Sequence, residues 1–332
     1  MRHLRHFIKN ITGSLLPVVF TLGGCHTAPE TKTNIDRMEQ RLFSIPTDSV
    51  EAAVPHLRLR YGRLFELYNN RIIAIGPSTN PQYPQKLIEF LTDSRMYATY
   101  RKVMAYYPDV TDLEKELTAA FSRYHKYFPN RDIPSVYTLI SGFNQSMSVD
   151  EGLLAISLDK YLGMNEDYYI GLDIPAYQRR LMDKPYIVPD CMKAMAYTEF
   201  PDTDTVNTVL SSILYEGKIA YFVSRMLPAL PDSLIFGYTA AQMQWCKNNT
   251  RQMWTFLVEK KMLYRTDYLT IAKLVKPAPF TSFFTRESPG RAAVWLGYQI
   301  IQSYVASEKL SLDELMNRRN DPTLLSKAKF RP

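Results

Sequence analysis

Apolar residues recur at helical spacing along most of the chain. They fall at intervals of three or four positions from Leu57 to Tyr68 and again from Leu113 to Phe128, which places each set on one face of a helix. Thr111 and Glu114, at the start of the second stripe, have the spacing of a capping box. We predict further helices over 84–90, over 204–226, from Thr239 with Gln242 closing a capping box, and from Pro289, capped by Ser288, to Ala306.

Two segments break this helical spacing. Residues 135–140 are β-branched and aromatic, and residues 153–158 form an apolar run, both of which are typical of strands. Residues 142–145, with the sequence Gly-Phe-Asn-Gln, predict a turn between them. We therefore expect an α+β fold that is predominantly α-helical with a small antiparallel β-sheet.

The N-terminus has the composition of a targeting segment. Cations between positions 2 and 9 precede an apolar stretch over residues 11–22, which is shorter than the roughly 20 residues that a transmembrane helix needs. Leu-Gly-Gly-Cys at positions 22–25 then has the form of a bacterial lipobox, in which the thiol of Cys25 takes the lipid. The alternative is an ordinary secretory signal with an incidental cysteine.

These features divide the chain into three parts. Residues 1–24 are the predicted lipoprotein signal peptide, and residues 25–45 are the lipidated cysteine and a flexible tether. Residues 46–332 form a single α-rich domain, since no repeat or Gly/Ser linker divides them. Lipid chains anchor a protein because each buried methylene contributes about 0.8 kcal/mol. We expect a protein that is lipid-anchored in the cell envelope, on the outer membrane with its body facing the periplasm, because no acidic residue that could mark surface export follows Cys25 until Glu30.

The net charge limits the kinds of partner that the protein can have, and the cysteine content bears on disulfide formation. The net charge of +7 falls to +4 once Arg2, Arg5 and Lys9 of the signal are removed, and no run of Lys and Arg with interleaved aromatic residues indicates nucleic-acid binding. The membrane, through the lipid anchor, and envelope proteins are the expected partners. Cys191 and Cys246 are predicted to be buried free thiols, with a disulfide between them as the alternative in an oxidising compartment.

Little in the sequence indicates catalysis. Beyond the signal and the tether the histidines are His56 and His125, whereas catalytic zinc usually takes two or three histidines at defined spacing. The sequence contains no GxSxG, no HExxH and no nucleotide-binding glycine loop. We predict no catalytic residue, no metal and no cofactor, and we leave open a hydrolase that uses a pair of carboxylates.

Several segments of the second half resemble one known family. They are Leu158–Gly163 (LDKYLG), Ile213–Lys218 (ILYEGK), Gly237–Thr239 with Gln242 and Trp245, and Glu287–Arg291 (ESPGR) followed by Trp295–Ile300. In their order and spacing they are similar to the gliding-motility lipoprotein B (GldB) family of Bacteroidota, over residues 133–332. The resemblance implies a lipoprotein of the gliding and associated protein-secretion apparatus without an assigned catalytic activity.

A fainter similarity links the same region to the zincin metallopeptidases, in which HExxH places two zinc-binding histidines on one helical face. The aligned residues begin at Tyr215 and end at Ile219, so that Glu216 keeps the carboxylate while both ligand positions are lost. The similarity implies a degenerate zincin-like core that retains a binding cleft. The alternative is a plain amphipathic helix in which Gly217 permits close packing.

Glu216, Lys218 and Arg291 are the candidate cleft or partner-contact residues. As cleft residues, Lys218 and Arg291 suit a ligand that bears a carboxylate or phosphate. Their structural alternatives are a snorkelling Lys218 and an Arg291 paired with Glu287. We accordingly expect a non-enzymatic component of the gliding-motility and protein-secretion machinery. The alternatives are a glycan- or peptide-binding envelope lipoprotein and a hydrolase with an unrecognised carboxylate site.

Overall fold

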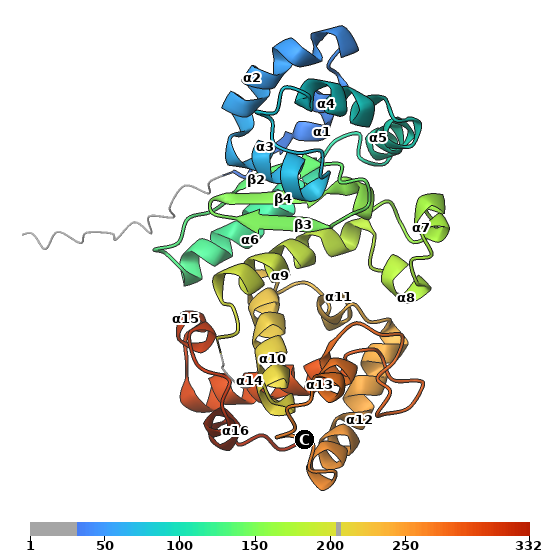
Figure 1. Ribbon diagram of the computed structural model, residues 1–332. Helices are drawn as coiled ribbons and strands as arrows, with labels where there is room; N and C mark the ends of the chain where they lie inside the picture. Colours follow the sequence, from blue (N-terminus) through green and yellow to red (C-terminus); the bar gives the residue numbers. More distant parts are fainter. Residues whose placement is uncertain (1–31, 204–206) are drawn as a thin grey trace, which may run out of the picture. The chain divides into compact units, whose positions relative to one another are not determined.

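A computed structural model of the protein describes residues 32–203 and 207–332 (Figure 1). The predicted signal peptide and Cys25 lie outside the described residues. The described residues all belong to one compact unit, and helices predominate in it, as expected. None of the described helices is both long enough and apolar enough to span a membrane.

The strands of the described part form one mixed sheet. They are β1 (Ile35–Arg37), β2 (Ser135–Leu139), β3 (Met147–Asp150) and β4 (Leu153–Ser157), in the spatial order β1-β2-β4-β3. β1, β2 and β4 run parallel, whereas β3 runs antiparallel to β4. The α+β fold is therefore confirmed, and the prediction of an antiparallel sheet is only partly right.

The path of the chain explains why the sheet is mixed rather than antiparallel. Residues 140–146 do not turn the chain back into β4 but carry it across to β3 at the edge of the sheet. The reversal comes after β3, at the two-residue turn Glu151-Gly152, where Gly152 has a φ of +69°. β4 then returns between β2 and β3, parallel to β2. With the sequence Met-Ser-Val-Asp, β3 is short and half polar, so the apolar pattern does not predict it.

The helices fall into three groups along the chain. The first comprises α1 (Met38–Phe43), α2 (Val50–Tyr61), α3 (Arg63–Leu67), α4 (Tyr83–Thr92), α5 (Ser94–Tyr106) and α6 (Thr111–Tyr127). The second comprises α7 (Asp167–Gly171), α8 (Ala176–Arg179) and α9 (Ile187–Glu199). The third comprises α10 (Val209–Met226), α11 (Asp232–Phe236), α12 (Ala240–Glu259), α13 (Tyr268–Val275), α14 (Ala292–Glu308), α15 (Leu312–Met316) and α16 (Pro322–Ala328).

The sheet buries both of its faces. Alternate residues of β4 point to opposite sides, so that Leu153 and Ala155 join a smaller core with α1 to α4, while Leu154 and Ile156 join a larger core with α6, α9 and α10. In Figure 1 these two sets of helices lie on opposite sides of the strands. Burial on both faces explains why the β4 segment is apolar almost throughout.

The folded body begins earlier in the chain than predicted. Residues 35–43, assigned to the tether, form β1 and α1, and Met38 and Leu42 are fully buried in the smaller core. The predicted tether of residues 25–45 is therefore wrong at its C-terminal end. The apolar residues of this segment occupy one short strand and one short helix, and neither is long enough to show a period.

Two glycines bring the backbones of α10 and α14 into contact. A Cβ atom at Gly217 would lie 2.3 Å from the carbonyl carbon of Gly297, and one at Gly297 would lie 1.9 Å from the carbonyl oxygen of Ile213. Both distances are far inside van der Waals contact, so the crossing of these helices requires glycine at both positions. The close packing at Gly217, which was part of the alternative to a zincin-like core, is present, but α10 is buried on most sides and is not a plain amphipathic helix.

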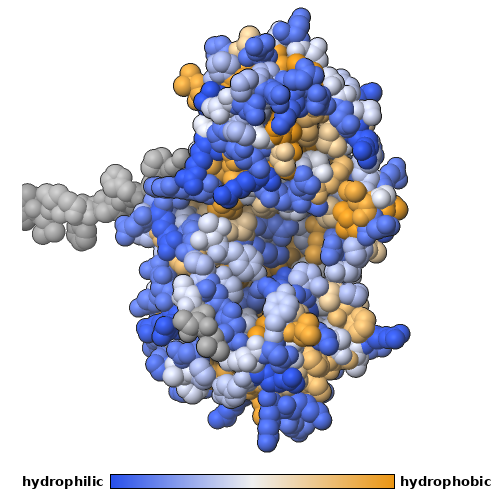
Figure 2. Space-filling view, in the orientation of Figure 1, coloured by the Kyte–Doolittle hydropathy of each residue, from blue (hydrophilic) through white to orange (hydrophobic). Residues whose placement is uncertain are grey.

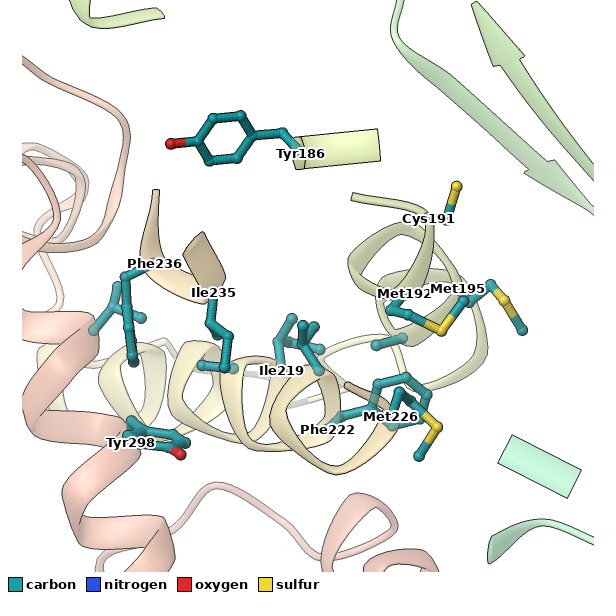
Figure 3. Packing of buried hydrophobic residues seen from close by; sticks show 14 of the residues in the cluster. Tyr186, Cys191, Met192, Met195, Ile219, Phe222, Met226, Ile235, Phe236 and Tyr298 are labelled. Atoms are coloured by element: carbon teal, nitrogen blue, oxygen red, sulfur yellow. The ribbon is translucent and has the colours of Figure 1, made fainter. Parts of the chain in front are cut away.

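α10 also packs against α9. Figure 3 shows Met192 of α9 and Phe222 of α10 in the space between the two helices, and both belong to the larger core. Cys191 of α9 points away from α10, and its sulfur lies 3.8 Å from that of Met147 in β3. α10 is thus enclosed by neighbours along most of its length, and most of its residues are buried.

The two cysteines of the described part are buried free thiols, as predicted. Burial raises the pKa of Cys191 and raises that of Cys246 to about 12. Both side chains therefore stay protonated at neutral pH and pack as small apolar groups.

We predict that Gly217→Ala destabilises the fold by about 1–3 kcal/mol or more, the usual effect of overpacking. The added methyl group meets backbone atoms, which cannot rotate away as a side chain can. Alanine ordinarily stabilises a helix over glycine by roughly 0.5–1 kcal/mol, so even the sign of the change tests the contact. Urea unfolding of residues 26–332 measures the effect.

Gly171→Ala is the matched control, because Gly171 ends α7 and a Cβ atom there would meet nothing within 4 Å. We expect this variant to be as stable as the wild type or slightly more stable. A Gly217→Ala protein with wild-type stability would contradict the close contact between α10 and α14.

Candidate functional site

Glu216 lies near the middle of α10, beside the crossing with α14. The helix begins with a capping box, in which Thr208 and Ser211 each accept the backbone N–H of the other. The side chain of Glu216 is only 9% exposed. A carboxylate that is so buried needs a partner, because the loss of water is costly for an isolated charge.

Arg291 supplies that partner. Its Nη2 atom lies 2.8 Å from Oε2 of Glu216, and its Nε donates to the carbonyl of Val275 at 3.1 Å. The hydroxyl of Tyr197, on α9, donates to the same Oε2 atom at 2.6 Å. Burial, followed by the negative charge of Glu216, raises the pKa of Tyr197, so the phenol keeps the proton that it donates. The cluster joins α9, α10 and the residue that precedes α14.

The backbone of Arg291 has an uncommon conformation. Its φ is +63°, in the left-handed region that residues other than glycine rarely adopt. Two contacts hold it there: the hydroxyl of Tyr238 donates to the carbonyl of Arg291 at 3.1 Å, and Gly290 packs against Ala278, whose carbonyl oxygen would lie 1.9 Å from a Cβ atom. A strained residue persists where its surroundings fix it, and strain of this kind is concentrated at functional sites.

The predicted pairing of Arg291 with Glu287 is wrong. Glu287 is exposed, whereas Arg291 reaches the buried Glu216, which lies 75 positions away in the chain. The left-handed φ of Arg291 accompanies this pairing. Sequence proximity alone therefore selected the wrong carboxylate.

The predicted start of the last long helix is also wrong. α14 begins at Ala292 rather than at Pro289, and the hydroxyl of Ser288 donates to the carbonyl of Thr285 at 2.6 Å instead of capping a helix. The backbone N–H of Ala292 donates to Oγ1 of Thr281 at 2.9 Å. A side chain from an earlier loop thus satisfies the first N–H group of this helix.

Lys218 lies apart from the ion pair. Two positions along a helix turn the side chain by about 200°, so Lys218 leaves α10 on the side opposite to Glu216. The residue is 2% exposed, and its ammonium donates to the carbonyl of Arg318, which follows α15. The structure therefore brings together Glu216 and Arg291, and it places the third candidate elsewhere.

The residues aligned with the zinc ligands of zincins are engaged in packing. The hydroxyl of Tyr215 donates to the carbonyl of Phe200 at 3.0 Å, and Ile219 is buried in the larger core. Within residues 32–203 and 207–332, no three His, Cys, Asp or Glu side chains lie close enough together to hold a metal ion. The similarity to zincins stays a hypothesis.

Asp159 is a buried carboxylate to which the sequence reading gave no role. It is fully buried and accepts the backbone N–H of Ser141 at 2.9 Å and that of Phe143 at 2.7 Å. Burial raises the pKa of Asp159, and these hydrogen bonds oppose the shift. The carboxylate holds the connection between β2 and β3, where Gly142 and Phe143 both have positive φ. An acidic residue two positions after a buried strand was the available signal, since a buried carboxylate needs donors.

An open cleft of about 280 Å³ adjoins the ion pair. Its wall includes aromatic side chains, several cations and two amides, contributed by Lys160, Tyr161, Tyr177, Gln178, Arg180, Asp190, Phe236, Tyr238, Gln242, Pro279 and Arg291 among others. A small hollow next to it touches Glu216, Tyr197 and Arg291. Arg291 therefore belongs both to the ion pair and to the wall of the cleft.

The fold and this cluster define an α+β protein in which an ion pair between the buried Glu216 and the half-buried Arg291 lies beside the crossing of two helices. The chain belongs to the family described as gliding motility protein GldB, whose model matches residues 26–332. The resemblance to this family is thereby confirmed. A search of curated proteins found no match, and a search of solved structures found none either.

We predict that Glu216→Gln destabilises the protein by about 1–3 kcal/mol, because it leaves the guanidinium of Arg291 without its counter-charge in a largely desolvated site. A double-mutant cycle with Arg291→Gln, followed by urea unfolding at pH 7, isolates the coupling between the two side chains.

Glu287→Gln serves as the control for loss of a carboxylate in the same region, and we expect it to leave stability unchanged because Glu287 is exposed. A rise in stability on Glu216→Gln would contradict a stabilising role for the ion pair. Residues that are kept for function are often the ones whose replacement stabilises a fold.

Proposed function

We propose that this chain is a membrane-anchored, non-enzymatic lipoprotein of the gliding-motility and associated protein-secretion machinery of the cell envelope. Membership of the GldB family supports the link to gliding motility. The ion pair carries the non-enzymatic part of the proposal, because Arg291 and Tyr197 bind the carboxylate of Glu216. His56 and His125 are exposed on α2 and α6. Glu216 therefore has a structural role, in which it links α9, α10 and the start of α14.

An apolar surface supports contact with a protein partner. Met164, Ile170 and Leu172, on and beside α7, are 42%, 51% and 56% exposed, and Figure 2 shows an orange area where Figure 1 draws α7. Apolar side chains that gather on a surface are typical of interaction sites. We assign the partner contact to this area around α7.

The proposed anchor is lipid on Cys25, with the body held at the outer membrane and facing the periplasm. From Cys25 to Lys32, the first described residue, the chain reaches at most about 25 Å when fully extended. A lipid at Cys25 would therefore keep the folded body next to the membrane surface. Partners of such a protein are other components of the envelope.

We predict that Cys25→Ser abolishes lipidation, because the thiol is the atom that takes the lipid. The variant should remain an unprocessed precursor and incorporate no labelled palmitate, whereas Cys246→Ser, which removes a buried thiol, should be labelled like the wild type. Equal labelling of the Cys25→Ser protein would exclude the anchor. Protease added to intact cells tests the placement, and ready digestion of the body would contradict a periplasmic orientation.

We also predict that the protein needs no zinc and cleaves no peptide. Metal analysis of purified residues 26–332 should find no stoichiometric zinc, and a peptidase screen should not separate the wild type from Glu216→Gln. Stoichiometric zinc, together with cleavage that is lost in Glu216→Gln, would identify an active peptidase and overturn the proposal.

A glycan- or peptide-binding lipoprotein is the second candidate function, and the cleft favours it. Aromatic rings beside amide and charged groups are suited to hold such ligands. Pull-down of the native lipoprotein from envelopes, followed by mass spectrometry, separates this role from membership of a protein machine.

A hydrolase with an unrecognised carboxylate site has less support, because donors engage the buried carboxylates described above. A third buried carboxylate, Glu39 in α1, is likewise bound, by Nε of Arg37 and the hydroxyl of Thr138, both at 2.8 Å.

A further inference from the structure

Two cations in the wall of the cleft lack a carboxylate partner in the described part of the chain. Of the charged groups that line the cleft, Arg291 is paired with Glu216 at 2.8 Å, and Asp190 is paired with Lys193 at 3.2 Å. Lys160 and Arg180 form no ion pair with a described carboxylate, and their hydrogen bonds go to neutral oxygen atoms. The cleft wall therefore holds two cations that have no ion-pair partner among the described residues, and of these Lys160 feels the more distant charge of the buried Asp159.

Backbone carbonyl groups hold both cations in place. Nζ of Lys160 donates to the carbonyl of Phe143 at 3.0 Å, and Nη2 of Arg180 donates to the carbonyl of Gly237 at 2.7 Å. Ammonium has three donors and guanidinium has five, so each keeps donors for another acceptor. Burial lowers the pKa of Lys160, and the negative charge of Asp159 opposes that shift, which agrees with an ammonium group in a partly desolvated place.

The rest of the wall suits a small organic molecule rather than a bare ion. Tyr177, Phe236 and Tyr238 are among the residues that line the cleft, and aromatic side chains bury apolar parts of a ligand. The cleft volume of about 280 Å³ lies near the lower end for small-molecule sites. Asp190 also lies in this wall, and although Lys193 pairs with it, its carboxylate repels the second negative charge of a phosphate more than the single charge of a carboxylate.

We propose that the cleft binds a small molecule with a single carboxylate group, which Lys160 and Arg180 recognise while the aromatic wall covers its apolar part. This inference goes beyond the proposed function and does not depend on the lipid anchor or on the partner contact around α7. The carboxylate of the ligand supplies the ion-pair partner that no described residue provides for these two cations. A charged acceptor of this kind forms the stronger class of hydrogen bonds.

The test compares acids with their neutral amides on residues 26–332, which contain the whole described unit. N-acetyl-alanine, N-acetyl-leucine and N-acetyl-phenylalanine are titrated by calorimetry against the corresponding N-acetyl amino acid amides, with phenyl phosphate as a third arm. We expect at least one acid to bind tenfold or more tightly than its amide, and phenyl phosphate to bind more weakly than that acid.

Variants then locate the site. Lys160→Gln and Arg180→Gln should each weaken binding of that acid by about tenfold, which corresponds to 1.4 kcal/mol, whereas Arg251→Gln, which removes an exposed cation on α12, should leave binding unchanged. If the acids bind no better than their amides, the proposal is overturned, and this result does not depend on any variant. Tighter binding of phenyl phosphate would overturn the choice of a carboxylate, and wild-type affinity in both cleft variants would overturn the site.

Discussion

The structure depends on the contact between Gly217 of α10 and Gly297 of α14. Because neither residue has a side chain, the two backbones touch, and α14 lies against a helix that also packs on α6, α9 and α13. The same contact places the ion pair. Glu216 is next to Gly217, and Arg291 precedes Gly297 by six positions, or about 9 Å along a helix axis. The carboxylate and the guanidinium therefore meet at the rim of the crossing.

Patterns in the sequence predicted those features that neighbouring residues decide. Thr239 and Gln242 form the expected capping box, because both partners stand in the same helical turn. Thr111 and Glu114 have the same pattern, and α6 does begin at Thr111, but Glu114 accepts the N–H of Ile35 in β1 at 3.0 Å. The pattern thus predicted the helix start to within one residue, but the predicted capping box does not form: the N-cap is Val110, without a side-chain cap bond, and Glu114 binds a strand 79 positions away.

Features that depend on distant residues were not predictable in this way. Both central strands were identified, yet their relative direction follows from the connection after β2, which Asp159 binds from 16 to 18 positions further on. Glu216 and Arg291 were both named as site residues, but their pairing spans 75 positions and no local pattern encodes it. The misplacement of Lys218 is different, because the helical angle between it and Glu216 already separates the two side chains.

Three of the segments that carry the family resemblance meet at the cleft, whereas Ile213–Lys218 contributes no residue to it. Its wall takes Lys160 and Tyr161 from the first segment, Gly237, Tyr238 and Gln242 from another, and Pro289 to Arg291 from the last. Close backbone packing, such as that of Gly290 on Ala278, builds part of this wall. Packing alone does not require a cation at Lys160, where burial disfavours the charged form, the negative charge of Asp159 offsets this only in part, and no described carboxylate forms an ion pair with it. A negative charge from a ligand would stabilise a cation at such a place, so the cleft, more than the internally balanced ion pair, is where a ligand is to be sought.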